Sequence, residues 1–279
     1  MKGPIVLKRK RHLSLVVLLS AIIVQTANCM YSLNNEFIKA CKLNDSNEAK
    51  SLLEKGASPK SACIETMNSA LHIACQNGNL DMVKLICEKT KIKPEYINDT
   101  PNNKNDTALH LACKSKNLKL VKYLIEEKNA LLDDDGEECY IRGKNALIIH
   151  ECACIQGDLR MLKYLCKTPL GKEVAVRKPL LHYACKSKNF ALVKWVFNFK
   201  IKNRRSKKEI NREFVRVYKP LHYACMYSNP EIVQYLIEEC EADINEKIHG
   251  KTETPLSLAE KHKKSDIEVY LKSKLKEKK

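Results

Sequence analysis

Short apolar segments recur along the chain every 31 to 41 residues, and each has the spacing of a buried helix face. In the clearest copies a leucine and an alanine stand three positions apart, with a histidine after the leucine and a cysteine after the alanine. These copies are Ala70–Cys75, Ala108–Cys113, Leu180–Cys185 and Pro220–Cys225, and weaker copies surround Ala40, Ala153 and Ala259. Residues three apart lie on one side of a helix. Each segment therefore predicts a short helix with one buried stripe.

A second apolar segment follows each of these first helices after a polar turn. In six of the seven copies an Asn or Asp stands five residues after the alanine, where its side chain can accept hydrogen bonds from the free N–H groups of a helix start. These residues are Asp45, Asn79, Asn117, Asp158, Asn189 and Asn229. Apolar residues then recur three to four apart, as in Leu80, Val83, Ile86 and Cys87. We predict seven helix pairs that bury their apolar faces only by stacking in series.

The Leu-His-x-Ala block followed by an Asn-led or Asp-led helix resembles the ankyrin repeat, and the resemblance covers residues 33–275. It implies an all-α fold, an ankyrin-repeat solenoid of about seven helix-turn-helix units with projecting hairpin-like loops. It also implies that the motif histidine bonds the backbone of its own unit and of the adjoining one. The residues in that position are His72, His110, His182 and His222.

Several positions depart from the ankyrin pattern. The glycine that usually closes the first helix is present as Gly78 and Gly157, and the other five units carry Asn44, Lys116, Lys188, Ser228 and Lys263. Because glycine adopts a left-handed helix end without strain, we expect these five turns to be strained or differently shaped. Glu151 and Ser257 replace the histidine in the fourth and seventh units, and we expect the last helix to start one residue late. Three connections are long: 89–105, 128–144 and 198–218.

The resemblance also suggests which side chains face a partner. In ankyrin repeats the two residues after the motif Ala-Cys usually face the concave groove. Here they are Gln76, Asn77, Lys114, Ser115, Ile155, Gln156, Lys186, Ser187, Met226 and Tyr227. These residues predict a polar groove with two cations at one end and an apolar anchor at the other, suited to an acidic protein partner. The alternative is an ordinary exposed helix surface.

The first 29 residues have the three parts of a secretory signal peptide. Five cations precede an apolar run from Leu13 to Val24, and a polar stretch that contains Ala27 and Cys29 follows it. We predict cleavage before Met30 and export of the remainder. A membrane anchor formed by an uncleaved signal is the alternative. In a secretory lumen Asn44, Asn98 and Asn105 would be glycosylation acceptors.

Composition and charge narrow the class of partner only in part. With 44% hydrophobic and 30% charged residues the chain is globular, and after residue 29 no apolar run is long enough to span a membrane. The net charge is +17, of which the signal segment holds five, leaving +12. The basic runs 200–208 and 272–279 contain no aromatic residues for base stacking. We therefore interpret them as a solvated loop and a basic tail (276–279), not as a nucleic-acid site. A nuclear-import signal or a contact with an anionic surface is the alternative for either run.

Six of the 13 cysteines share one position in successive repeats: Cys41, Cys75, Cys113, Cys154, Cys185 and Cys225. Stacked helices lie roughly 8–10 Å apart, whereas a disulfide requires Cα atoms closer than about 7 Å, so this ladder cannot crosslink itself. Buried thiols behave as small apolar side chains. So many of them favour a reducing compartment, which conflicts with the usual destination of a signal peptide. Transfer into the cytosol of another cell would remove the conflict.

Nothing in the sequence indicates catalysis. His150-Glu-Cys-Ala-Cys154 lacks the second histidine of a zinc-protease motif and any partner Cys-x-x-Cys. The acidic stretch 133–138 has Leu131 where a calcium loop needs an oxygen donor. Serine-nucleophile, phosphate-loop and kinase signatures are absent. We expect no cofactor and no metal.

The combined prediction is a monomeric, non-catalytic protein-interaction scaffold that binds a protein through its concave surface and loop tips. One alternative is a secreted effector that acts in the cytosol or nucleus of another cell. A second alternative is a metal-dependent enzyme built on the His150–Cys154 cluster.

Overall fold

The structure, a computed structural model, describes residues 5–90, 97, 98, 102, 106–130, 149–167, 169–177, 179–203, 205–212, 218–248 and 252–277, with side chains from residue 23 except 90, 170 and 177. The chain divides into two compact bodies, Met1–Leu111 and Ala112–Lys279. In the described ranges the regular elements are helices, and the extended pairing consists of isolated bridges such as the one between Ala62 and Ser69.

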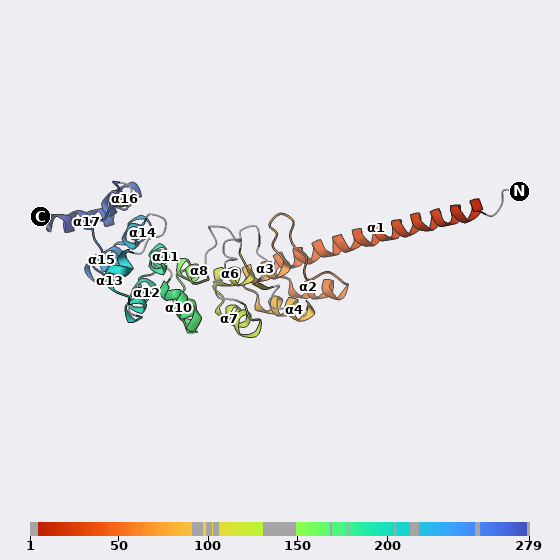
Figure 1. Ribbon diagram of the computed structural model, residues 1–279, viewed down its shortest axis with the longest axis horizontal. Helices are drawn as coiled ribbons and strands as arrows, with labels where there is room; N and C mark the ends of the chain where they lie inside the picture. The colour runs from red at the N-terminus through yellow and green to blue at the C-terminus, as the bar shows by residue number, and fades with distance from the viewer. Residues whose placement is uncertain are drawn as a thin grey trace. The chain divides into compact units, whose positions relative to one another are not determined.

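The N-terminal body is built from helix pairs (Figure 1). Helix α1 spans Ile5–Leu43 and packs against α2 (Ser46–Glu54) and α3 (Ala70–Gln76). Helix α4 (Leu80–Thr90) packs against both α2 and α3. First helices therefore contact first helices, and second helices contact second helices, as stacking requires. Helix α6 (Ala108–Lys114) begins in this body and ends in the next.

In the C-terminal body the same stacking continues over four repeats (Figure 1). The first helices α8 (Ile149–Ile155), α11 (Leu180–Lys186), α14 (Pro220–Tyr227) and α16 (Pro255–Lys261) pack one on the next. The second helices are α9 (Leu159–Leu165), α12 (Phe190–Lys202), α15 (Pro230–Glu238) and α17 (Ser265–Glu277). Helix α15 packs against both α12 and α17.

Some elements are additions to the repeat pattern. The second helix of the third repeat is α7 (Leu118–Lys122), which continues as a π-helical turn, η1 (Tyr123–Glu127). Helices α10 (Pro169–Arg177) and α13 (Lys207–Arg212) lie in connections between repeats, and α13 occupies part of the long connection 198–218. The loop 58–69 in the N-terminal body is a hairpin, in which the Cys63 N–H donates to the Asn68 carbonyl over 2.8 Å.

The predicted caps hold the second helices in place. Side-chain oxygens of Asp45, Asn79, Asn117, Asp158, Asn189 and Asn229 accept from backbone N–H groups of the helices that follow them. Two of the asparagines also bond the preceding repeat: Asn79 Nδ2 donates to Asn44 Oδ1 at 2.7 Å, and Asn189 Nδ2 donates to the Gly157 carbonyl at 2.8 Å. One residue thus starts a helix and ties it to its neighbour.

The expectation of a late last helix is wrong. Helix α17 begins at Ser265, six residues after Ala259, and α15 likewise begins six residues after Ala224. The Lys264 N–H donates to the Ala259 carbonyl at 2.9 Å, as the Asn79 N–H does to the Ala74 carbonyl at 3.0 Å. The backbone turn is the same as in the second repeat, although lysine supplies no carboxylate or amide oxygen to cap the helix.

The turns without glycine follow two courses. Asn44, Lys116, Lys188 and Lys263 have φ between 55° and 62°, close to Gly78 at 68° and Gly157 at 69°. Most residues other than glycine have a strained backbone in this left-handed region, because their Cβ atom comes close to a backbone carbonyl. Ser228 is instead extended, with φ −90° and ψ −166°, and α14 is eight residues long where the other first helices of this body have seven. The sixth repeat therefore has a differently shaped turn.

The predicted cleavage point before Met30 lies inside the continuous helix α1. The side chains of Ile23, Val24, Met30 and Tyr31 on this helix are exposed. Among the residues whose placement is described, no helix has the length and apolar character needed to cross a membrane.

Candidate protein-binding surface

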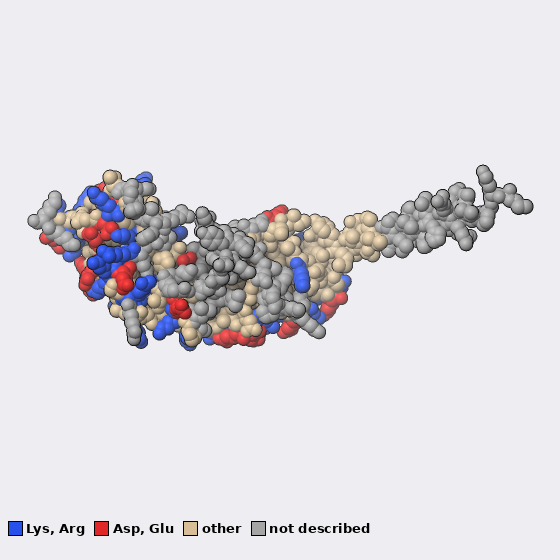
Figure 2. Space-filling model, in the orientation of Figure 1, with Lys and Arg blue, Asp and Glu red and all other residues tan. Residues whose placement is uncertain are grey.

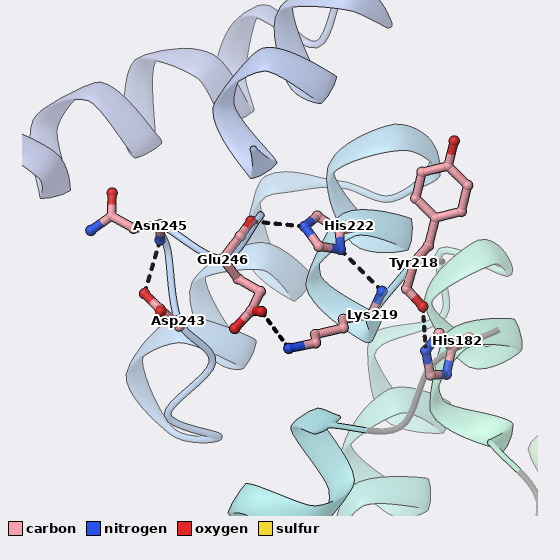
Figure 3. A network of polar contacts seen from close by, with 7 residues as sticks. All are labelled: His182, Tyr218, Lys219, His222, Asp243, Asn245 and Glu246. Atoms are coloured by element: carbon pink, nitrogen blue, oxygen red, sulfur yellow. Dashed lines mark hydrogen bonds and ion pairs between the residues drawn. The ribbon is translucent and has the colours of Figure 1, made fainter. Parts of the chain in front are cut away.

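The motif histidine of the sixth repeat joins two repeats through both ring nitrogens (Figure 3). His222 Nδ1 accepts from the Lys219 N–H at 3.0 Å, and Nε2 donates to the Glu246 carbonyl at 3.0 Å. Burial lowers the pKa of His222, and the one N–H of a neutral ring is sufficient for this pattern. His72 and His110 accept in the same way, at Nδ1, from the N–H of the residue three positions earlier.

Proline changes this arrangement in the fifth repeat. The residue three positions before His182 is Pro179, which has no N–H to donate. His182 Nδ1 lies 3.1 Å from the Pro179 carbonyl. Its Nε2 lies 3.1 Å from the Tyr218 carbonyl (Figure 3). Both neighbours are acceptors, so both nitrogens donate only when the ring is protonated.

The fourth repeat places its histidine in the core. His150 occupies the leucine position of the motif, which Leu181 and Leu221 fill in the next two repeats, and it has 0% exposure. Neither ring nitrogen has a hydrogen-bond partner among the described residues. Burial lowers the pKa of His150 to about 4, and the backbone of Gly171 offsets this only in part.

The ten predicted groove residues differ in what they present. Gln76, Lys114 and Lys186 are exposed. Asn77 is also exposed, but its Nδ2 donates to the Cys41 carbonyl of the preceding repeat at 3.0 Å. The Ser115 and Ser187 hydroxyls donate to their own helices, each to the carbonyl three residues earlier at 2.7 Å. The second residue of these pairs therefore supports the helix end more than it presents a free group. Ile155 and Gln156 are half-buried.

Met226 cannot be the exposed apolar anchor that we expected, because only 6% of it is accessible. The extra residue at the end of α14 shifts the turn by one position. The Ser228 hydroxyl then donates to the Cys185 carbonyl of the preceding repeat, as Asn77 does to Cys41 in the second. Because Ser228 forms this bond between repeats, Tyr227 does not, and it lies half-buried at the surface.

Aromatic side chains of the C-terminal body gather around Tyr227. Its ring centroid is 5.8 Å from that of Tyr223, one turn earlier on α14, and 6.0 Å from that of His262 at the end of α16. The ring of Tyr218 meets Tyr223 edge-on at 6.0 Å, and Lys186 Nζ of α11 lies 5.5 Å from the Tyr227 centroid. We call Tyr218, Tyr223, Tyr227, His262 and Lys186 the tyrosine patch. Of these, Tyr227 and Lys186 were predicted from the sequence. The i, i+4 spacing of Tyr223 and Tyr227 was a signal that could have identified Tyr223, whereas Tyr218 and His262 join the patch only through the fold.

Eight of the described cysteines have a raised pKa because they are buried, whereas a hydrogen bond with the Thr66 side chain lowers the pKa of Cys63. Burial raises the pKa of Cys41, Cys166, Cys225 and Cys240 to about 12, so these thiols are protonated at neutral pH. Every described cysteine is a free thiol, and only Cys29 is exposed. In the described part of the chain no three His, Cys, Asp or Glu side chains are grouped to hold a metal ion, and this part includes His150–Cys154. The acidic stretch 133–138, Cys139 and Asn105 lie outside the described residues.

The basic runs are not continuous exposed segments. Lys200 has 0% exposure, and its Nζ donates to the Val176 carbonyl at the end of α10 over 3.1 Å. Near the C-terminus, Lys272 pairs with Glu268 at 2.5 Å and with Glu260 at 3.2 Å. Figure 2 shows cations and carboxylates intermixed on the visible face of the C-terminal body. An interspersed surface of this kind lacks the single-sign field that favours nucleic acid.

Comparison with known proteins agrees with this architecture. A family model described as ankyrin repeats (3 copies) matches residues 37–135 and 181–278. The crystal structure of the human ASB11 ankyrin repeat domain is similar with a TM-score of 0.63 and 20% identity, over 84% of this chain and 95% of that one. A complex of the predatory endopeptidase Bd0816 from Bdellovibrio bacteriovorus with the immunity protein Bd3460 gives a TM-score of 0.44 and 20% identity, over 86% and 97%. A search of curated proteins finds no match.

The stretch between the two family matches contains the fourth repeat, where His150 and Glu151 replace the usual leucine and histidine. The structure nevertheless forms the helix pair α8 and α9 there, and α8 packs on α11 as any first helix does. The family model covers more than half of the sequence, and the helix pairs stack as its repeats require. The chain belongs to the ankyrin repeat family.

Proposed function

We propose that this chain is a non-catalytic scaffold that binds a protein partner through the tyrosine patch. Ankyrin repeats generally mediate protein–protein interaction. The observation that supports the proposal is the gathering of half-buried tyrosines with an exposed histidine and lysine, on or next to three adjacent first helices. Tyrosine offers a large apolar ring and a polar hydroxyl with few rotatable bonds, so it is enriched among the residues that dominate binding energy.

The chemistry of the patch favours an acidic partner with an apolar anchor. Lys186 supplies a cation beside Tyr227, and the rings of Tyr223 and Tyr227 offer faces and edges for apolar contact. The family is typically non-catalytic, and the buried thiols described above are protonated. A scaffold fits these features better than an enzyme does.

We propose further that the chain is exported by the signal segment 1–29, on the basis of its charge and apolar pattern. Mass analysis of the mature protein from expressing cells would give Met30 as the first residue. A mature chain that begins at Met1 would contradict cleavage.

Affinity capture with quantitative mass spectrometry tests the patch. The chain is immobilised as wild type and as Tyr223→Ala/Tyr227→Ala, and partners enriched by the wild type are then measured for affinity in purified form. We expect the double variant to weaken a true partner by roughly 100-fold or more, because each tyrosine is expected to act as a binding hot spot.

The matched control is Tyr31→Ala/Tyr270→Ala, which removes two tyrosines outside the patch and should retain the partner. Thermal denaturation of all three chains separates lost binding from lost folding. A partner that binds the patch variant and the wild type equally would refute this surface.

A further inference from the structure

A cleft lies beside the first helix of the sixth repeat. One of its walls is α13, which is an addition to the repeat pattern. The cleft has a volume of about 540 Å³ and lies between α13, the start of α14 and the loop 241–246. Lys208, Asn211 and Arg212 line it from α13. Their i, i+3 and i+4 spacing places all three on one face of the helix. Two cations one turn apart therefore flank an amide in a concave surface.

Most of the other charges of the cleft are already paired. Lys219 forms an ion pair with Glu246, whose carbonyl also accepts from His222 (Figure 3). Glu241 pairs at 2.8 Å with Lys207, next to the cleft. In the described part of the chain Lys208 and Arg212 have no ion pair or hydrogen bond, and both are exposed. The cleft thus offers two uncommitted cations. One lining carboxylate, Asp243, has no ion pair among the described residues and accepts from the Asn245 N–H at 2.9 Å.

Asn211 adds an unfilled acceptor to this wall. Its Nδ2 donates to the Cys240 carbonyl at 2.6 Å, which fixes the orientation of the amide. Its Oδ1 is buried and has no donor among the described residues. A buried acceptor without a partner is unfavourable, so a ligand gains a hydrogen bond when the amide turns toward the cleft and this oxygen meets its N–H.

We infer that this cleft binds an acidic peptide segment, with a carboxylate between Lys208 and Arg212 and a neighbouring backbone N–H at Asn211 Oδ1. A peptide carries both groups at adjacent positions, and carboxylates form strong charge-assisted hydrogen bonds with lysine and arginine. The inference rests on the proposed function in one respect, that the partner is a protein.

Nucleic acid fits the same wall less well. Among the lining residues His222 supplies the single aromatic ring, and both of its nitrogens are already bonded. Base recognition in single strands depends on aromatic stacking. The cleft is therefore assigned to a peptide.

Fluorescence anisotropy with defined probes tests this assignment on the full chain. The probes are labelled N-acetylated hexaglutamate, hexaglutamine and hexadeoxythymidylate. We expect binding of hexaglutamate, and a loss of about tenfold or more in Lys208→Gln/Arg212→Gln, because two charge-assisted contacts disappear. The control Lys194→Gln/Lys276→Gln removes two other exposed cations with the same change in net charge, and should stay within about twofold of wild type.

A second variant addresses the acceptor. Asn211→Ala should weaken hexaglutamate by about threefold to tenfold, the range for one lost hydrogen bond, with its folding monitored by thermal denaturation because the bond to Cys240 is also lost. Equal losses in the two double variants would overturn the inference. Binding of hexadeoxythymidylate or hexaglutamine as tight as that of hexaglutamate would overturn it as well.

The tyrosine patch variant separates this site from the proposed function. Tyr223→Ala/Tyr227→Ala should bind hexaglutamate as wild type does, since no patch residue lines the cleft. If that variant keeps the peptide but also keeps the protein partner, the patch is refuted and the cleft stands. If the patch variant loses the partner while Lys208→Gln/Arg212→Gln leaves the peptide affinity unchanged, the cleft is refuted and the patch stands.

Discussion

The first helices of the fourth and sixth repeats, α8 and α14, share a motif but use histidine in opposite ways. In α14 the ring of His222 is bonded on both sides and connects the Lys219 backbone to the Glu246 backbone. In α8 the histidine stands one position earlier, in the core, where neither nitrogen is bonded to a described residue. A shift of one residue therefore converts a connector into a buried polar group, and the fold tolerates it because stacking distributes stability over neighbouring repeats.

The turns that follow these two helices differ as well. After α8 the chain turns through Gly157 in the left-handed region, whereas after α14 it turns through an extended Ser228. The first course allows a compact helix of seven residues. The second lengthens the helix and brings Tyr227 to the surface. The same pair of helices thus differs in core chemistry and in surface chemistry.

Replacement of His150 by leucine should have the largest effect and make α8 resemble α14 in its core. Burial lowers the pKa of His150 to about 4, below the value near 6.5 of an unfolded histidine. Between pH 6.5 and 4 the unfolded chain binds the proton first, so the wild type loses stability as the pH falls through this window. The difference of about 2.5 pKa units corresponds to roughly 3 kcal/mol.

Urea denaturation at a series of pH values measures this effect. The free energy of unfolding of His150→Leu should fall less than that of wild type between pH 6.5 and 4, and should be higher at pH 7 because an unsatisfied polar group is removed. Parallel pH curves for the two chains would show that His150 is not buried in its neutral form.

Glycine should stabilise the turn after α8 and destabilise the turn after α14. Gly157→Ala places a side chain at φ 69°, with ordinary contacts to Ser187 and Asn189, so we expect a loss of roughly 1–2 kcal/mol from backbone strain alone. Ser228→Gly removes the hydrogen bond to the Cys185 carbonyl and frees an extended backbone, and should also cost roughly 1–2 kcal/mol.

Lys188→Gly is the matched control for the turns, because Lys188 has φ 60° and glycine relieves its strain. Chemical denaturation should show this variant stabilised by roughly 0.5–1 kcal/mol. If Ser228→Gly is stabilising as well, the sixth turn has the same left-handed conformation as the others and the distinction fails.

The smallest effect is expected at Pro179, where serine would give α11 the connector found in α14. Serine restores the N–H that Pro179 lacks and adds a capping hydroxyl, while the flexibility gained by the unfolded chain offsets part of the benefit. A net gain of about 0.5 kcal/mol is expected from denaturation curves. Nitrogen NMR shifts of His182 should change at Nδ1, which accepts a hydrogen bond from the serine N–H in the variant. An unchanged Nδ1 signal would contradict the proposed role of proline.

Much of this architecture could be predicted from the sequence because it depends on local rules. The helix pairs, the six Asn or Asp caps and the unusual turns followed from spacing, side-chain hydrogen bonding and the conformational freedom of glycine. The burial of Met226 could not be predicted, because it depends on which residue of α14 reaches the Cys185 carbonyl in the stacked neighbour. The cleft beside α13 could not be predicted either, because it depends on where a helix lies inside a long connection.

The lengthened helix α14 has a consequence for how such a surface can arise. One extra helical residue turns the last side chain by about 100° around the axis. A position that elsewhere fastens one layer to the next thereby becomes available for recognition, while the neighbouring serine takes over the fastening. Binding specificity can then change while the packing between repeats stays the same, because one added residue at the end of a helix changes which side chain is exposed.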